Sequence, residues 1–353
     1  MDRPAINIAL PLLILSAVAL GAVLYVLHSI LIPLVLAGFL AIIFKPLVGV
    51  VRRLGAPTWV GLLLVLLMTS AAIYSTSVIV SWGVQSAVEK APEYSKRVVR
   101  MIGRAEDLVA QYGGRIDANL LDRLEQVISA ERAVGIAGSW VGSALTVLSD
   151  GTLVLLFLIF MVLGGDLFAR KLQVAFHDVT AVNAVRIYDT LNMKVLRYLR
   201  LKTLINLFTG LVVYAVLEAF GVDFAPVMGL LAFLFNYIPN MGSFIMTVLP
   251  GAIAAVQFEN VGFALIIVGV LIVVQNLIGN IIEPKIMGTS LDISPVVVLF
   301  SLVFWGWMWG IVGMILSVPI MAVVKTLMEQ FPTTKPLAIL MGSTVPSSSE
   351  EFR

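Results

Sequence analysis

The polar side chains best suited to bind a small solute lie inside apolar stretches of the second half of the sequence. One stretch carries Gln275, Asn276, Asn280 and Glu283, and an earlier one carries Asn206. Because Asn276, Asn280 and Glu283 follow i, i+4, i+7 spacing, we expect them to share one helical face that points into the protein. Amides both donate and accept hydrogen bonds, so this group suits an uncharged, hydroxylated solute better than a bare ion.

A second polar group lies where the sequence predicts a break between two short helices. Asn236, Pro239, Asn240 and Gly242 fall within the segment N-Y-I-P-N-M-G, in which proline and glycine disfavour a continuous helix. We predict that these four residues and the five named above bind solute together. The alternative is that the amides form hydrogen bonds between helices and stabilise the bundle. Glu283 is expected near the cytoplasmic boundary, paired with a lysine or capping a broken helix.

The sequence offers few groups for catalysis or metal binding. It contains no cysteine, and its two histidines, His28 and His177, lie far apart. Neither a nucleophile with an adjacent base nor a cluster of metal ligands occurs at a recognisable spacing. We therefore expect no enzyme activity, no cofactor and no bound metal. The formal charge of +2 does not indicate nucleic acid as a partner, because the basic residues cluster beside apolar runs and set membrane orientation there.

The composition indicates an all-α integral membrane protein. Of 353 residues, 60% are hydrophobic and only 12% are charged, with a mean hydropathy of +1.03. Several apolar runs reach about 20 residues, the length with which a helix crosses about 30 Å of hydrocarbon. No cleavage site follows the first run, which is expected to be a retained helix. We predict about six spanning helices, at 6–27, 30–51, 59–82, 141–164, 203–220 and 261–282.

Charged residues outside these runs predict the topology. Lys45, Arg52 and Arg53 follow the second span, which places that end in the cytoplasm. Residues 85–140 carry balanced charges and are expected to form extracytoplasmic amphipathic helices, either as a ligand-binding cap or packed against the membrane or a neighbouring subunit. Residues 166–202 carry excess Lys and Arg, which predicts a cytoplasmic amphipathic helix that lies at the membrane surface or is simply solvated.

A repeated pattern in the last third predicts two broken helices. Four residues recur at a constant offset of 69: Asp223, Pro226, Val227 and Pro250 correspond to Asp292, Pro295, Val296 and Pro319. Each copy breaks in its middle, and its arms of about 10 to 16 residues, roughly 15 to 24 Å, are shorter than about 30 Å of hydrocarbon. We predict two re-entrant hairpins of inverted topology, near 226–251 and 295–325, with a binding site near the membrane midplane. The alternative is two tilted spans per copy, kinked at proline.

These predictions divide the chain into six regions. Residues 1–84 form a scaffold of three spans, and residues 203–330 form an inverted-repeat transport domain. Between them lie the extracytoplasmic helices, a fourth span at 141–165, and the cytoplasmic segment. Residues 331–353, which are rich in Pro, Ser and Glu, are expected to be a disordered cytoplasmic tail.

Three motifs resemble those of the autoinducer-2 exporter family. They are N-x-I-P-x-x-G at Asn236, Ile238, Pro239 and Gly242, E-P-x-x-M-G at Glu283, Pro284, Met287 and Gly288, and G-x-x-G-x-x-L-x-x-P at Gly310, Gly313, Leu316 and Pro319. The resemblance covers the chain from Ile6 to about Glu329. It implies a bacterial inner-membrane exporter of the quorum-sensing signal autoinducer-2, a small oxygen-rich furanone derivative. It also implies homo-oligomers, pentamers in particular, embedded in membrane lipid, and elevator-like movement of the hairpin-bearing half against spans one to four.

Two other functions are open on the sequence alone. Some members of this family are described as sodium/proton antiporters, and many carry an acidic residue where this chain has Ile278. That difference weakens the antiporter interpretation, although Glu218, Asp223 and Glu283 are available for ion or proton coupling. A structural or assembly role would instead use the outer helical segment as a partner surface.

Overall fold

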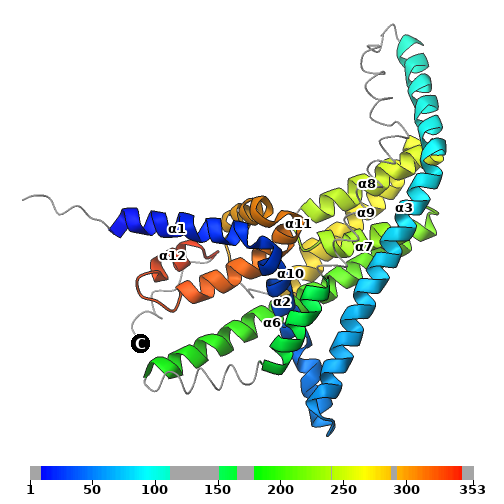
Figure 1. The fold of residues 1–353 in the computed structure, drawn as a ribbon. Helices are drawn as coiled ribbons and strands as arrows, with labels where there is room; N and C mark the ends of the chain where they lie inside the picture. The colour runs from blue at the N-terminus through cyan, green and yellow to red at the C-terminus, as the bar shows by residue number, and fades with distance from the viewer. Residues whose placement is uncertain (1–8, 112–150, 165–178, 240, 288–291, 344–353) are drawn as a thin grey trace, which may run out of the picture. The chain divides into compact units, whose positions relative to one another are not determined.

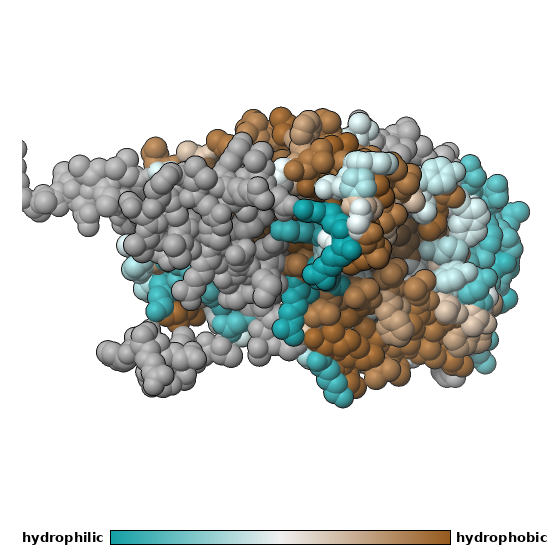
Figure 2. Space-filling view, turned by 90° about the horizontal axis from the view of Figure 1, so that it is seen from below, coloured by the Kyte–Doolittle hydropathy of each residue, from teal (hydrophilic) through white to brown (hydrophobic). Residues whose placement is uncertain are grey.

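The computed structural model describes residues 9–111, 151–164, 179–239, 241–287 and 292–343, and every regular element within these ranges is a helix (Figure 1). Residues 112–140 of the predicted outer segment and 166–178 of the predicted cytoplasmic segment lie outside them. Apolar side chains cover much of the visible surface of the described residues (Figure 2). Six described helices are long and apolar enough to cross a membrane: His28–Arg53, Thr58–Asp107, Leu196–Ala219, Met241–Phe258, Val261–Met287 and Pro295–Met328. A shorter apolar helix covers Gly151–Gly164. The predicted all-helical, multi-pass membrane architecture is therefore confirmed.

The N-terminal helices are α1 (Ala9–Val26), α2 (His28–Arg53) and α3 (Thr58–Gln111). The turn between α1 and α2 lies at Leu27, whereas the predicted spans 6–27 and 30–51 left residues 28 and 29 for it, and α2 begins at His28. α3 contains 54 residues, about 80 Å of helix, and runs without interruption from the predicted third span into the predicted outer segment. Residues 85–111 are hereafter the α3 extension. α6 (Val179–Ala219) likewise joins part of the predicted cytoplasmic helix to the fifth span.

The chain forms two compact units. The first contains Met1–Pro46, Leu153–Val195 and Leu291–Arg353, and the second contains Leu47–Thr152 and Leu196–Ser290. The first copy of the repeat thus belongs to the second unit, and the second copy belongs to the first unit. All nine predicted solute-binding residues fall in the second unit.

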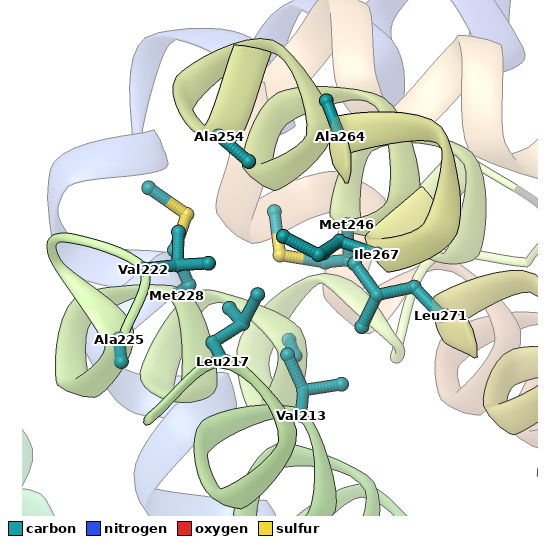
Figure 3. Close-up of a cluster of buried hydrophobic side chains, with 11 residues drawn as sticks. Val213, Leu217, Val222, Ala225, Met228, Met246, Ala254, Ala264, Ile267 and Leu271 are labelled. Atoms are coloured by element: carbon teal, nitrogen blue, oxygen red, sulfur yellow. The ribbon is translucent and has the colours of Figure 1, made fainter. Parts of the chain in front are cut away.

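The core of the second unit lies between α6, α7 (Ala225–Phe235), α8 (Met241–Phe258) and α9 (Val261–Asn276). Leu217 in α6, Met246 in α8 and Ile267 in α9 are completely buried where these helices meet (Figure 3). α9 continues into a π-helix, η1 (Leu277–Ile282), and then into α10 (Glu283–Met287). Burial of these apolar side chains packs α7 and α8 against α6 and α9.

The first hairpin consists of α7 and α8, joined through residues 236–240. Its arms approach so closely that a Cβ atom at Gly242 would lie 2.1 Å from the carbonyl oxygen of Phe235. α7 also crosses α6 closely, because a Cβ atom at Gly210 would lie 2.7 Å from the carbonyl oxygen of Gly229. Small residues allow such close approach of helix backbones. Gly242 is therefore required by the space available between the two arms.

The second hairpin is contained in α11 (Pro295–Met328), whose backbone leaves helical geometry at Gly310, with φ 62° and ψ −144°. The Ser301 hydroxyl donates to the carbonyl oxygen of Ser317 at 3.0 Å, although 16 residues of straight helix would separate these groups by about 24 Å. A Cβ atom at Gly313 would lie 2.0 Å from the carbonyl oxygen of Trp305. α11 therefore folds back on itself, which confirms the predicted break near Gly310.

The turn of the second hairpin packs against the N-terminal helices of its own unit. Trp305 and Trp309 are buried together with Leu24 and Leu31 as neighbours. The indole Nε1 of Trp309 donates to the carbonyl oxygen of Leu24 at 3.2 Å. These tryptophans thus hold the turn against the junction of α1 and α2.

Residues 331–343 include a helix, contrary to the expectation that a disordered tail begins at residue 331. The rest of the predicted tail, residues 344–353, lies outside the described residues. α12 (Lys335–Leu340) buries Ala338 completely. The backbone N–H of Ser294 donates to the carbonyl oxygen of Met341 at 2.8 Å. The composition of the last residues obscured the short apolar run of α12, of which Ala338 is buried.

We predict that Gly242→Ala destabilises the protein by about 2 kcal/mol, because the added methyl group overlaps the carbonyl of Phe235 and forces the two arms apart. The measurement is the unfolding midpoint in detergent. Gly269→Ala is the matched control, since a Cβ atom at Gly269 meets nothing within 4 Å. The control should be neutral or stabilising by up to about 1 kcal/mol. Equal midpoints for the two variants would contradict the proposed role of Gly242.

Candidate functional site

The turn of the first hairpin is held by polar side chains of α6. Asn206 is completely buried. In the orientation that satisfies its amide, the oxygen accepts from the backbone N–H of Tyr237 at 3.2 Å and the nitrogen donates to the carbonyl of Lys202 at 3.3 Å. The hydroxyl groups of Thr203 and Tyr237 are hydrogen-bonded at 2.7 Å. The predicted residue Asn206 therefore joins the predicted break to the fifth span, through partners that the sequence had not indicated.

The remaining turn residues differ in what they contribute. The carbonyl oxygen of Pro239 accepts a hydrogen bond from the backbone N–H of Met241 at 2.7 Å, and Gly242 lies buried at the start of α8. Both shape the turn through the backbone. Asn240 lies outside the described residues.

A partly buried ion pair joins α6 to the end of the sixth span. The ammonium group of Lys202 is 2.5 Å from a carboxylate oxygen of Glu283, and Lys202 is only 7% exposed. This confirms the expectation that Glu283 pairs with a lysine. Charge counting had assigned Lys202 to the cytoplasmic segment, and the signal that identifies its position is its spacing of one helical turn from Asn206 on α6. Removing charges from water is costly, so the pair persists only because each charge neutralises the other.

The π-helix separates Glu283 from the two asparagines with which it was expected to share an inward face. Asn280 donates to the amide oxygen of Asn276 at 2.8 Å, and Asn276 donates to the carbonyl of Ile272 at 2.9 Å. Both asparagines are exposed, so the expectation that they point inward is wrong. A π-helix contains more residues per turn than an α-helix and changes the register of the residues that follow it. Glu283 consequently faces α6 while the asparagines do not.

Two predicted residues carry buried amide atoms that have no hydrogen-bond partner among the described residues. They are Nε2 of Gln275, a residue that is 6% exposed, and Oδ1 of Asn236. α8 and α9 are antiparallel with Gly251 beside Val268, and this register places Gln275 level with the first turn of α8, near the hairpin turn. Each unpaired buried group costs about 1 to 3 kcal/mol. One donor and one acceptor near this turn therefore have no partner among the described residues.

The opposite end of the first hairpin is bound by the α3 extension. Asp223, which precedes α7, accepts hydrogen bonds from Lys90 at 2.5 Å and from the Tyr94 hydroxyl at 2.9 Å. Glu259, which follows α8, forms ion pairs with Arg100 and Arg104. The hydrogen bond from Arg100 lowers the pKa of Glu259 below its usual range. Both carboxylates are therefore engaged by cations of the α3 extension.

Comparison with known proteins shows similarity over nearly the whole chain. The sequence model of one family, described as AI-2E family transporter, matches residues 13–333. The chain is similar to the AI-2 transport protein TqsA of Escherichia coli strain K12, with 32% identity over 316 residues that cover 89% of this chain and 90% of that protein. It is also similar to the putative transport protein YhhT of the same strain, with 30% identity over 347 residues, or 98% of this chain and 97% of that protein. The putative transport protein YueF of Bacillus subtilis strain 168 is 27% identical over 313 residues, which cover 83% and 82% of the two chains.

We predict that Lys202→Met destabilises the protein by about 3 kcal/mol, because it leaves the Glu283 carboxylate without its cation. Adding Glu283→Gln should restore most of this loss, since the remaining amide carries no charge. Unfolding free energies of the two single variants and the double variant form the required cycle. Lys285→Met, at an exposed lysine of α10, is the control and should change the free energy little. A double variant as unstable as the sum of the two single variants would show that the pair is not coupled.

Proposed function

The chain belongs to the AI-2E transporter family, and from this premise we propose that it exports a small polar solute, autoinducer-2 in the first instance, across the bacterial inner membrane. The solute assignment follows the relative TqsA, which is named an AI-2 transport protein, whereas other relatives are named only as putative transport proteins. The proposal makes the chain a transporter without enzymatic activity. Assembly into homo-oligomers, pentamers in particular, is part of the same proposal.

The observation that carries this proposal is the unpaired donor and acceptor at the turn of the first hairpin. Gln275 and Asn236 offer one hydrogen-bond donor and one acceptor in a buried setting formed by α7, α8 and α9. An uncharged solute with hydroxyl or carbonyl groups satisfies both atoms without bringing a charge into the membrane. Asn206, Pro239 and Gly242 then position the turn, and the exposed pair Asn276 and Asn280 lines the route to it.

The dimensions of the first hairpin support its re-entry into the membrane. Its turn meets α6 at Thr203 and Asn206, roughly 20 to 24 Å before the end of α6 at Ala219. This distance is shorter than about 30 Å of hydrocarbon, so a hairpin that enters at one surface turns back inside. The α3 extension, predicted to be extracytoplasmic, binds the open end of the hairpin. We infer that the first hairpin enters from the extracytoplasmic side.

An antiporter would need a carboxylate that exchanges ions during transport. Two of the three candidate carboxylates already have cationic partners, since Glu283 pairs with Lys202 and Asp223 pairs with Lys90. These pairs favour solute export over sodium/proton exchange. For export we propose elevator-like alternating access, in which the hairpin-bearing part moves against the remaining spans.

We predict that Gln275→Met lowers the transport of labelled autoinducer-2 into proteoliposomes about fivefold, which corresponds to the loss of one hydrogen bond to the solute. Its unfolding midpoint should stay equal or rise, because the variant removes a buried donor that has no partner. The double variant Asn276→Leu and Asn280→Leu, compared in the same assay, should show a smaller loss. Transport by Gln275→Met at the parent rate would exclude a solute contact at this residue. No autoinducer-2 transport by the parent protein would overturn the solute assignment.

We predict that a disulfide between α3 and the first hairpin stops transport reversibly. In Gly83→Cys with Val227→Cys, the two Cβ positions are 3.6 Å apart, within the usual range of about 3.5 to 4.5 Å for a disulfide. Elevator movement of the hairpin against α3 separates these positions, so oxidation should stop transport and reduction should restore it.

The matched control for this disulfide is Gly251→Cys with Val268→Cys, whose Cβ positions are 3.8 Å apart in α8 and α9. Both helices belong to the proposed moving part, so this crosslink should leave transport intact. The chain contains no native cysteine that could react instead. Undiminished transport after complete oxidation of the first pair would rule out movement of the hairpin against α3.

A further inference from the structure

The two copies of the repeat carry the same kind of contact at the open ends of their hairpins. Asp223 precedes α7 in the second unit, and Asp292 precedes α11 in the first unit, 69 residues later. Each aspartate carboxylate accepts hydrogen bonds from one lysine and one hydroxyl group. The donors are Lys90 and Tyr94 for Asp223, and Lys325 and Ser343 for Asp292. The open end of each hairpin is thus organised around an aspartate.

In both copies, the end of the second arm reaches back to the loop that precedes the first arm. The Gln257 side chain accepts from the backbone N–H of Asp223 and donates to the carbonyl of Gly221, each at 2.7 Å. The Lys325 ammonium group donates to both the carbonyl and the carboxylate of Asp292. Each hairpin is therefore closed from within by its own second arm.

Each aspartate also holds a segment from outside its hairpin. At Asp223 this segment is the α3 extension, part of a helix of 54 residues. At Asp292 it is the C-terminal segment, because the backbone N–H and the hydroxyl of Ser343 donate to Oδ1 at 3.0 and 2.7 Å. The carbonyl of Met341 additionally accepts from Ser294. Lys325 donates to the other carboxylate oxygen, Oδ2, at 2.8 Å. Asp292 therefore binds the second arm through Oδ2 and the C-terminal segment through Oδ1.

We propose that residues 341–343 form a releasable latch on the second hairpin, with the chain's own C-terminal segment as the partner of Asp292. Residues 341–343 follow a helix of only six residues, whereas the α3 extension belongs to a helix of 54 residues, so the C-terminal segment can leave its aspartate with less movement of the chain. The latch adds to the closure that Lys325 provides at this end of the second hairpin, and its release loosens that end. This inference goes beyond the transport proposal and is tested without any solute.

The test is hydrogen–deuterium exchange of the full chain in detergent, with Ser343→Pro as the variant. Proline removes the backbone N–H, and the substitution also removes the hydroxyl, so Oδ1 of Asp292 loses both hydrogen bonds from Ser343 while Lys325 keeps its bond to Oδ2. Amides near both ends of α11, such as those of Val298 and Glu329, should exchange about tenfold faster, the effect of losing a hydrogen bond to a charged group. Segments from α7 and α8 should exchange at the parent rate.

Ser343→Ala is the graded control, because it removes the hydroxyl and keeps the N–H donor. It should accelerate exchange in α11 by a smaller factor than Ser343→Pro. Faster exchange confined to residues 335–343, with α11 at the parent rate, would overturn the latch, since the segment would then be attached without closing the hairpin. Unchanged exchange everywhere would overturn it as well. If Ser343→Pro also accelerates exchange in α7 and α8, Ser343→Ala decides by the same criterion.

Discussion

Backbone groups that leave helical geometry have to find hydrogen-bond partners within the protein where water cannot reach them, and the turn of the first hairpin depends on this constraint. The backbone N–H of Tyr237 finds its acceptor in the amide of Asn206, and the Tyr237 hydroxyl is bonded to Thr203. Side chains of α6 therefore supply hydrogen-bond partners at the interruption between α7 and α8. Lys202, one turn from Asn206, carries the same network to Glu283 at the end of the sixth span. While these partners hold the turn, Nε2 of Gln275 and Oδ1 of Asn236 stay without a hydrogen-bond partner among the described residues, which is why the transport proposal places the solute there.

The two hairpins solve the problem of turning back with the same local device. Gly242 and Gly313 each stand opposite a carbonyl group of the preceding arm, at positions where any Cβ atom would overlap it. Their arms can therefore pack backbone against backbone before the chain turns. The turns then differ in their support, since polar groups of α6 hold the first and tryptophans hold the second. Equivalent hairpins thus have turns of opposite character, one polar and one aromatic.

Much of this arrangement could be predicted from the sequence, because breaks and repeats leave a local signal. The interruptions near Gly242 and Gly310, the correspondence of Asp223 with Asp292, and a lysine partner for Glu283 were all expected. The separation of Glu283 from the face of Asn276 and Asn280 was not, since the π-helix at Leu277–Ile282 violates the 3.6-residue period on which face assignments depend. Contacts between residues that are far apart in sequence could not be predicted for a different reason. The bond between Asn206 and Tyr237 depends on how two helices pack, and spacing along one helix carries no information about it.

The unbroken course of α3 connects the first hairpin to the far end of a long helix. Gly83 lies against the first hairpin at Val227, and about 40 Å of further helix extends from there to Gln111. A tilt of about 10° at Gly83 would displace the far end of such a rod by about 7 Å. A small change in the tilt of α3 at the first hairpin would therefore displace Gln111, at the far end of the helix, by a larger distance. A molecule bound at the far end of α3 would therefore restrain the tilt of this helix where it meets the first hairpin.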